Sequence, residues 1–297
     1  METPPQETGT LIKGIGGFYY ALTKNGDVKV LRAKGAFRKR GITPLIGDEI
    51  ILQAGKDEQH GWIMDILERK NQLIRPPVAN ISYIVIVISP IPSPDYLLVD
   101  TLLIMAFKQN IKPIIIVNKC DLDSNLFNKV NEMYKKTNIP VLAVSAYTGQ
   151  GIDELVPLLK EGIICFAGQS GVGKSTLLSK STGLTLQTGE ISKRNARGKH
   201  TTRHAELLIK DDFKVLDTPG FSLIELKSSI LPNELQNYYP EFTPYLNECK
   251  FSPCYHLCEP GCKILKEQQN GNIHPERLSR YHHLLKQIQE GWKKRYD

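Results

Sequence analysis

The first part of the chain alternates short apolar stretches with polar residues and turn signals. Residues 9–68 include the pair Asn25-Gly26, which is a strong signal for a tight hairpin between two strands. Five short strands in about sixty residues are typical of a small closed barrel of the OB type. The predicted strands cover residues 8–14, 16–23, 27–35, 48–55 and 60–68.

The pattern changes after residues 71–80, whose sequence is NQLIRPPVAN. The two adjacent prolines favour an extended chain, so this stretch is predicted to be a linker. Beyond it, apolar runs alternate with stretches that carry apolar residues at helical spacing. This alternation indicates a doubly wound parallel sheet with helices on both faces. The predicted strands are 81–89, 112–118, 139–146, 162–168 and 213–217, and the predicted helices are 94–110 and 124–138.

The end of the chain is polar and has a helical pattern. Residues 274–297 predict a basic helix that closes the chain. Its last cations are candidates for contact with RNA phosphates, and a solvated helix end is the alternative; they are Lys293, Lys294 and Arg295. The chain is therefore predicted to be an α/β protein in three parts, an OB-type barrel (1–70), an α/β domain (71–226) and a helical domain (227–297).

Composition narrows the class of protein only moderately. The 297 residues carry a formal net charge of +7, which suits a polyanionic partner but also an ordinary, mildly basic enzyme. No run approaches the roughly 20 apolar residues of a membrane span. The polar start METPPQETGT lacks the layout of a signal peptide. We therefore expect a cytoplasmic protein without membrane attachment.

A basic loop lies between the third and fifth predicted strands. Residues 34–41, KGAFRKRG, place four cations around Phe37. Barrels of this type bind RNA through basic loops and stacking aromatic rings, so this loop is a candidate RNA contact. A solvated hairpin loop is the alternative. The four cations are Lys34, Arg38, Lys39 and Arg40.

A phosphate-binding motif follows the apolar run 162–168. The sequence GQSGVGKST matches the pattern G-x-x-x-x-G-K-[ST] and leads into a helix-prone stretch. In that context backbone N–H groups hold phosphate oxygens, Lys174 reaches the β and γ phosphates, and Ser175 ligates Mg²⁺. The candidate residues are Gly168, Gln169, Ser170, Gly171, Val172, Gly173, Lys174, Ser175 and Thr176.

A base-reading motif precedes this loop in the chain. The Asp121 carboxylate of Asn118-Lys119-Cys120-Asp121 can accept two hydrogen bonds from guanine, and adenine offers no such pair of donors. The stem of Lys119 can lie along the base plane, and Asn118 can tie the loops together. Ser145-Ala146, at the end of the next predicted strand, would bring a backbone N–H near the guanine O6.

Asp217-Thr218-Pro219-Gly220 supplies a further nucleotide contact. Asp217 is expected to hold Mg²⁺ through water, and the Gly220 N–H is expected to sense the γ-phosphate. Phe221 stands where many GTPases have a glutamine that orients water, so we expect hydrolysis to be slow without assistance.

The stretch Gly198-Lys199-His200-Thr201-Thr202 is the candidate source of the remaining Mg²⁺ ligand and of a group that acts on water in place of the glutamine. Thr202 can complete the Mg²⁺ shell, and His200 is a candidate catalytic residue together with Lys174. An ordinary mobile loop is the alternative reading of this stretch.

The cysteines indicate metal binding and not disulfides. Four of the six lie between Cys249 and Cys262, and the spacing Cys249-x₄-Cys254-x-His256-x₅-Cys262 offers three thiolates and one imidazole. Four protein ligands close a tetrahedral Zn²⁺ site, so its role should be structural. Cys258 is an additional thiol that could replace a ligand, and free reduced cysteines are the alternative.

Taken together, these motifs resemble the bacterial ribosome small-subunit-dependent GTPase A family, the circularly permuted GTPases of ribosome biogenesis. The resemblance runs through nearly the whole chain, in RPPVAN, VNKCDL, VSAYTGQGIDEL, GQSGVGKSTLL, GEISKRNARGKHTTRHAEL, DTPGF and the Cys/His set. It places the family's switch histidine on His200 and its magnesium threonine on Thr202. Ala196 departs from the glycine expected there.

The resemblance implies a function and its cofactors. It implies a monomeric enzyme that hydrolyses GTP to GDP with Mg²⁺ and carries one structural Zn²⁺. It also implies stimulation by the small ribosomal subunit and its 16S rRNA during late 30S maturation. The alternative is a GTP-gated module that binds other structured RNA and hydrolyses GTP incidentally.

The order of the motifs defines the permutation, because the base-reading motif precedes the phosphate loop. Packing does not record chain order, so the same sheet is expected. In this order the second switch, from Asp217 to about Ser222, leads directly toward the terminal metal domain. Release of that switch after loss of the γ-phosphate would therefore move the attached domain.

Overall fold

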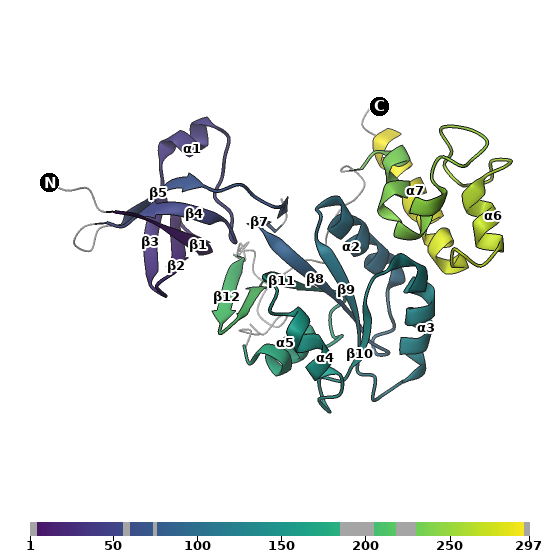
Figure 1. Cartoon of the computed structure of the whole chain (residues 1–297), viewed down its shortest axis with the longest axis horizontal. Coiled ribbons are helices and arrows are strands. Elements are labelled where there is room, and N and C mark those ends of the chain that lie inside the picture. The colour runs from purple at the N-terminus through teal and green to yellow at the C-terminus, as the bar shows by residue number, and fades with distance from the viewer. Residues whose placement is uncertain (1–4, 56–59, 74–75, 185–204, 218–229, 294–297) are drawn as a thin grey trace, which may run out of the picture.

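The N-terminal part is a closed five-stranded barrel. The computed structural model describes residues 5–55, 60–73, 76–184, 205–217 and 230–293 (Figure 1). The barrel strands are hydrogen-bonded in the order β1-β2-β3-β5-β4, and β4 pairs back with β1. This closure confirms the predicted OB-type barrel. Its elements are β1 (Gln6–Ile15), β2 (Phe18–Thr23), β3 (Val28–Ala33), α1 (Gly35–Lys39), β4 (Glu49–Gln53) and β5 (Gly61–Ile66).

The basic loop of residues 34–41 is arranged differently from the expectation. It contains the short helix α1, and Phe37 on this helix is only 5% exposed. The Phe37 ring packs with Leu11, Leu31 and Ile63 in the barrel core. The apolar side chain is therefore not available to stack on RNA, because the barrel interior needs it as packing material.

The predicted linker at 71–80 is extended at residues 72–73 and 78–79, as expected, and it also packs as a joint between the barrel and the central sheet. Strands β6 (Gln72–Leu73) and β7 (Val78–Ala79) pair in an antiparallel fashion. Val78 is fully buried and forms a bridge with Ile46 beside the barrel. Proline restricts the chain to extended conformations, but it does not prevent the apolar neighbours from being buried between two cores.

The central part is a six-stranded sheet covered on both faces, as predicted. Its strands run in the order β10-β9-β8-β11-β13-β12, and all neighbours are parallel except β12 and β13. The antiparallel strand β12 was not predicted. The elements are β8 (Ile81–Ile88), α2 (Tyr96–Lys108), β9 (Lys112–Asn118), α3 (Asn125–Tyr134), η1 (Lys135–Thr137), β10 (Val141–Val144), α4 (Ile152–Leu158), β11 (Ile163–Ala167), α5 (Lys174–Thr182), β12 (Glu206–Lys210) and β13 (Phe213–Asp217).

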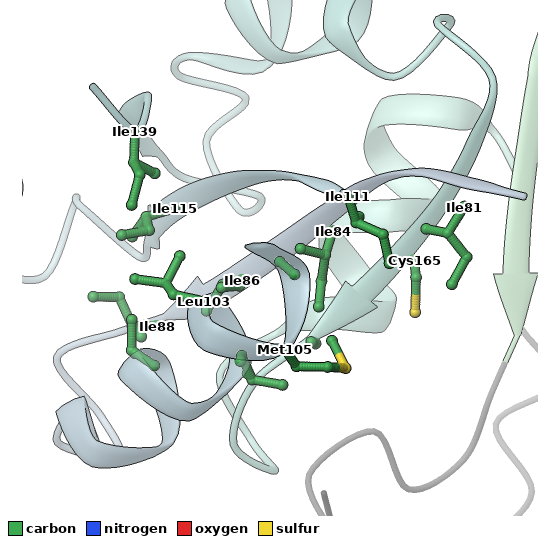
Figure 2. Close-up of a cluster of buried hydrophobic side chains, with 14 of the residues drawn as sticks. Ile81, Ile84, Ile86, Ile88, Leu103, Met105, Ile111, Ile115, Ile139 and Cys165 are labelled. Atoms are coloured by element: carbon green, nitrogen blue, oxygen red, sulfur yellow. The ribbon is translucent and has the colours of Figure 1, made fainter. Parts of the chain in front are cut away.

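The two faces of this sheet form separate apolar clusters. Figure 2 shows Ile84, Ile86 and Ile88 of β8 beside Leu103 and Met105 of α2. The alternate residues of β8 point to the other face, where they meet the helices α4 and α5. Strands that are buried on both faces have continuous apolar sequences. The central parallel strands could therefore be predicted from the sequence.

One further pairing joins the barrel to this sheet. Strand β1 pairs with β12 where Lys13 lies opposite Glu206, and the Lys13 ammonium forms an ion pair with the Glu206 carboxylate at 2.9 Å. The barrel and the central sheet are therefore hydrogen-bonded in a single eleven-stranded sheet.

The C-terminal part is helical and has an aromatic core. Tyr239, Phe242 and Tyr281 are buried there, with ring centroids 5.1 Å apart in each pair. Within the described ranges, no helix is long and apolar enough to cross a lipid bilayer. Lys294 and Arg295 lie outside the described residues. The elements are η2 (Pro232–Tyr238), η3 (Pro240–Tyr245), α6 (Lys263–Gln269) and α7 (Pro275–Lys293).

A buried ion-pair network fastens this helical part to the central sheet. Arg277 on α7 donates to the Glu241 carboxylate at 2.7 Å and to the Asp100 carboxylate on α2 at 2.5 Å. Arg280 also donates to Asp100, and the Tyr134 hydroxyl of α3 donates to the same side chain at 2.7 Å. Burial and the neighbouring Asp100 charge raise the pKa of Tyr134 well above its ordinary value.

Candidate functional site

The phosphate loop leaves β11 and enters α5 through backbone conformations that require glycine. Gly168 has a φ of +126°, and a Cβ there would lie 2.2 Å from the Val87 carbonyl oxygen. Gly173 has a φ of +91°, and its Cβ would lie 2.5 Å from Asn118 Nδ2. Side chains at these positions would collide with β8 or with the base-reading loop. The glycines thus let the loop turn tightly at the carboxyl edge of the sheet.

Lys174 lies inside this loop. Its Nζ donates to the carbonyl oxygens of Gly168 at 2.8 Å and Gln169 at 2.6 Å. Burial lowers the pKa of the Lys174 ammonium from its ordinary value, and no carboxylate partner is paired with it among the residues that the structure describes. A polyanion placed in the loop would supply that partner. Ser175 and Thr176 follow in the first turn of α5.

Asn118 joins three loops through its side-chain amide. The Asn118 side chain is buried, and its Nδ2 donates to the Val172 carbonyl oxygen at 2.8 Å. Its Oδ1 accepts a hydrogen bond from the Ala146 N–H at 3.1 Å. The base-reading motif, the phosphate loop and the Ser145-Ala146 strand end therefore meet in one place, although they are distant in sequence.

Lys119 reaches across the same loops. Its Nζ donates to the Gly171 carbonyl oxygen at 2.8 Å and to the Ile91 carbonyl oxygen at 2.5 Å. The stem of this side chain thus spans from β9 to the phosphate loop. Asp121 follows two residues later and is exposed, so its carboxylate is accessible to a ligand.

The remaining residues of these loops have structural contacts. Burial, and after it the Asp121 charge, raises the pKa of the Cys120 thiol, so this cysteine is not a thiolate nucleophile. The buried Ser145 hydroxyl accepts a hydrogen bond from the Thr148 N–H at 3.1 Å. The Ala146 N–H already has Asn118 as its acceptor.

Asp217 is the last residue of β13, the strand beside β11, from which the phosphate loop leaves. It is paired in register with Glu206 on β12, and burial followed by the Glu206 charge raises the pKa of the Asp217 carboxyl. The Lys13 ammonium of the barrel neutralises part of the charge of Glu206. Both contacts were missed in the sequence, because one depends on the unpredicted strand β12 and the other joins residues of different domains.

Several predicted residues lie outside the described part of the chain. They are Ala196, His200, Thr202, Thr218, Pro219, Gly220 and Phe221. The sequence also gave no sign that Gln169 accepts a hydrogen bond from the Asp95 N–H at 2.9 Å. That bond ties the phosphate loop to the start of α2, whose first turn Asp95 also caps.

A second candidate site lies in the helical part. The ligand atoms of Cys249, Cys254, His256 and Cys262 all lie within 4.8 Å of one another. His256 Nδ1 is 3.6 Å from the Cys249 sulfur and 3.3 Å from the Cys262 sulfur. A tetrahedral cation with bonds of about 2.0–2.3 Å places its ligand atoms roughly 3.3–3.8 Å apart.

The environment of this cluster also favours a cation. Burial raises the pKa of the Cys254 thiol to about 12, so a thiolate there needs positive charge nearby. The other imidazole nitrogen of His256, Nε2, lies 2.6 Å from the Gln236 amide oxygen. This contact holds the ring with Nδ1 toward the sulfurs. Cys258 is exposed and outside the cluster, which leaves Cys262 as the fourth member.

Comparison with known proteins identifies the family. The family model described as RsgA GTPase matches residues 66–227, and the one described as RsgA N-terminal domain matches residues 8–63. The chain belongs to the RsgA family. It is therefore a GTP hydrolase, and this membership confirms both the resemblance seen in the sequence and the predicted enzyme class.

Individual RsgA relatives match along almost the whole chain. The "Small ribosomal subunit biogenesis GTPase RsgA" of Ruminiclostridium cellulolyticum is 43% identical over 96% of this chain and 94% of its own. The crystal structure of YjeQ from Thermotoga maritima has a TM-score of 0.83 at 30% identity and covers 96% of this chain and 99% of its own. The structure of YloQ, described as a circularly permuted GTPase, has a TM-score of 0.80 at 31% identity and covers 96% of each chain. These neighbours confirm the circularly permuted GTPase fold.

Proposed function

We propose that the small ribosomal subunit stimulates GTP hydrolysis by this chain during late maturation of the 30S particle. The observation that carries the proposal is the junction at Asn118, which assembles base-reading and phosphate-binding loops in a chain whose relatives bear the name small ribosomal subunit biogenesis GTPase. We further propose that the chain acts in the cytoplasm as a monomer and that 16S rRNA is the polymer that it contacts.

The nucleotide contacts divide between two loops. The phosphate loop, residues 168–176, holds the phosphates through its backbone N–H groups, and Lys174 reaches the β and γ phosphates. Asp121 accepts hydrogen bonds from the guanine edge, and the strand end at Ser145-Ala146 closes the base pocket. This division is supported by the exposed side chain of Asp121 and by the half-buried ammonium of Lys174.

Magnesium and the attacking water complete the proposed site. Ser175, Thr202 and Asp217 would hold Mg²⁺, Asp217 through water, and the ion would neutralise charge on the phosphates. The Gly220 N–H senses the γ-phosphate, and His200 orients water in place of the absent glutamine. The position of Asp217 at the end of β13 supports its part in this assignment.

The deciding experiment measures GTP turnover with purified small ribosomal subunits and, separately, with free rRNA. We expect intact subunits to raise turnover far more than free RNA does. If free structured RNA stimulates equally well, the chain is a GTP-gated module for RNA in general, and the proposal is wrong.

Asp121→Asn tests the base-reading role. GTP binding is expected to weaken by about 10- to 100-fold, because hydrogen bonds to a charged group contribute roughly 1.5–3 kcal/mol. Preference should shift toward xanthine nucleotides, because the new amide presents a donor where guanine also donates. Direct titration with both nucleotides measures this. Asp123→Asn is the matched control, since it keeps an acceptor for the Asn125 N–H; unchanged GTP affinity in Asp121→Asn would remove Asp121 from the site.

We propose one structural Zn²⁺ on Cys249, Cys254, His256 and Cys262. Three sulfurs and one nitrogen are a donor set typical of structural zinc, and four protein ligands leave no position for catalysis. The bound ion would supply positive charge that stabilises the thiolates and the fold of the loop around them. The spacing of the ligand atoms supports this assignment.

Gln236→Ala tests the arrangement around this cluster. Loss of the amide that orients His256 is expected to weaken zinc binding by about 10- to 100-fold. Competition with a chromophoric chelator measures the affinity in the full chain. Gln287→Ala on α7, which lies outside the cluster, should bind zinc like the unmodified chain. Equal zinc affinity in Gln236→Ala would show that packing alone orients the imidazole.

A further inference from the structure

A cavity lies at the amino edge of the central sheet, at the opposite end of β9 from the base-reading motif. Its volume is about 500 Å³, which is within the range of small-molecule pockets. The ends of α2, η1 and α4 and the start of β9 form its walls. A strand rises about 3.3 Å per residue, so roughly 20 Å separates the first residue of β9, Lys112, from the last, Asn118. A small molecule in this cavity therefore does not reach the nucleotide loops.

The walls of the cavity are mainly apolar. Ile111 and Ile139 are buried and belong to the apolar cluster on the α2 face of the sheet. Leu158, at the end of α4, packs against the cluster on the other face. The cavity therefore lies at the edge of the sheet, between the helices of its two faces. Its apolar lining residues are Phe107, Ile111, Pro113, Ile139, Pro140 and Leu158.

One of the residues that line the cavity is a cation, Lys112. It is exposed, and its Nζ lies 5.3 Å from the centre of the Tyr83 ring and 3.4 Å from the Tyr83 hydroxyl oxygen. That hydroxyl donates to the Glu161 carboxylate at 2.5 Å, so Tyr83 links the two charged groups. None of the ion pairs among the described residues includes Lys112. Its ammonium can therefore pair with a ligand.

Two side-chain amides also line the cavity. Asn110 follows α2 and Asn138 follows η1, and both are exposed. Backbone carbonyls at the end of α2 are already bonded, because the Phe107 oxygen accepts from the Asn110 N–H at 3.1 Å and the Ala106 oxygen accepts from the Ile111 N–H at 2.8 Å. The lining thus offers one ammonium and two amide N–H donors. Such donors favour an anionic group on the ligand.

Apolar walls combined with a single cation select one class of ligand. A neutral apolar molecule leaves Lys112 unused, and a polyphosphate finds only one cation and apolar walls. We propose that this cavity binds a small carboxylic acid with an apolar body. The body packs against the apolar lining, and the carboxylate pairs with the Lys112 ammonium. This inference does not rest on the proposed function, because it uses no residue of the nucleotide loops.

The test uses the full chain and two fluorescent dyes that differ by one charge. Anilinonaphthalene sulfonate has an anionic group on an apolar body, and phenylnaphthylamine is the same body without that group. Lys112→Gln is expected to weaken binding of the anionic dye by about 2- to 5-fold, in line with an exposed ion pair, and to leave the neutral dye unaffected. Lys24→Gln, which removes an exposed cation between β2 and β3, is the matched control. Naphthoate, an apolar carboxylic acid, is expected to displace both dyes.

Leu158→Trp tests the apolar walls. Leu158 is half-buried, so a larger ring at this position takes up space in the cavity. Both dyes are expected to lose affinity by roughly 10-fold or more, because less apolar surface of the dye is buried. Leu67→Trp is the control, since Leu67 is 41% exposed and lies outside the cavity. Circular dichroism and GTP titration of each variant establish that its fold is intact.

Four results would overturn the inference. The first is an affinity for the anionic dye in Lys112→Gln equal to that of the unmodified chain. The second is full binding of both dyes by Leu158→Trp. The third is displacement of the dyes by saturating GTP, which would place them in the nucleotide site. The fourth is failure of naphthoate to displace them.

Discussion

Arg277→Ala is expected to destabilise the chain by about 3–5 kcal/mol, which is the usual effect of removing one partner from a buried ion pair. The side chains of Arg277 and Glu241 are each only 2% exposed. After the substitution the Glu241 carboxylate loses its two hydrogen bonds from the guanidinium and stays buried without them. Urea unfolding followed by circular dichroism measures the change.

A matched pair of charges provides the control for this prediction. Lys129 of α3 and Glu276 of α7 also bridge the central and helical parts, but both are about half exposed at a distance of 3.4 Å. Lys129→Ala should therefore change stability by less than about 1 kcal/mol. The double variant with Glu241→Ala and Arg277→Ala should lose less than the sum of the single variants. An Arg277→Ala chain as stable as the Lys129→Ala chain would contradict the prediction.

His200→Ala is expected to lose most of the turnover that the small subunit stimulates. Phe221 cannot orient water, and an imidazole on the preceding loop can accept a hydrogen bond from it. Positioned proton-transfer groups contribute about 10²–10⁴-fold in rate, so a loss in that range is expected. Single-turnover phosphate release at saturating subunits measures it.

Two further variants separate catalysis from binding. GTP affinity should survive in His200→Ala, whereas Lys174→Ala should reduce affinity along with rate, because its ammonium lies inside the phosphate loop. His283→Ala, which removes an exposed histidine of α7, should leave stimulated turnover unchanged. Full stimulated hydrolysis in His200→Ala would mean that the water is aligned by backbone groups or by ribosomal RNA.

Most of the fold could be predicted because its signals are local. The strands β8, β9 and β11 are continuous apolar runs. The barrel strands are short apolar stretches separated by turn residues. The strand β12 and the joint at Val78 were missed, because their short sequences acquire a structure only when distant strands pack against them. The divisions at residues 70 and 226 stay predictions.

The candidate site shows the same limit. The motif residues at 118–121, 145–146, 168–176 and 217 could be located because they lie at the ends of predicted strands, where ligands bind in such sheets. The Cys/His set could be located from its spacing. Contacts between distant side chains leave no pattern in the sequence. In the sequence alone, Arg277 looks like a solvated cation on a helix, and only the structure places Asp100 beside it. Gln236 likewise looks like a polar surface residue, and only the structure places it beside His256. The roles of Thr202 and Gly220 stay predictions as well.

The permuted order of strands has a consequence for how the chain folds while it is being made. Strand β8 lies between β9 and β11, but β11 begins at Ile163, long after β8 has ended at Ile88. At a synthesis rate of about 5–20 residues per second, the delay is roughly 4–15 seconds. During that interval one edge of a strand rich in isoleucine and valine has no partner, and such an edge can pair with other chains. The nascent chain therefore passes through a stage at which it is prone to aggregate, and this stage ends when β11 is inserted.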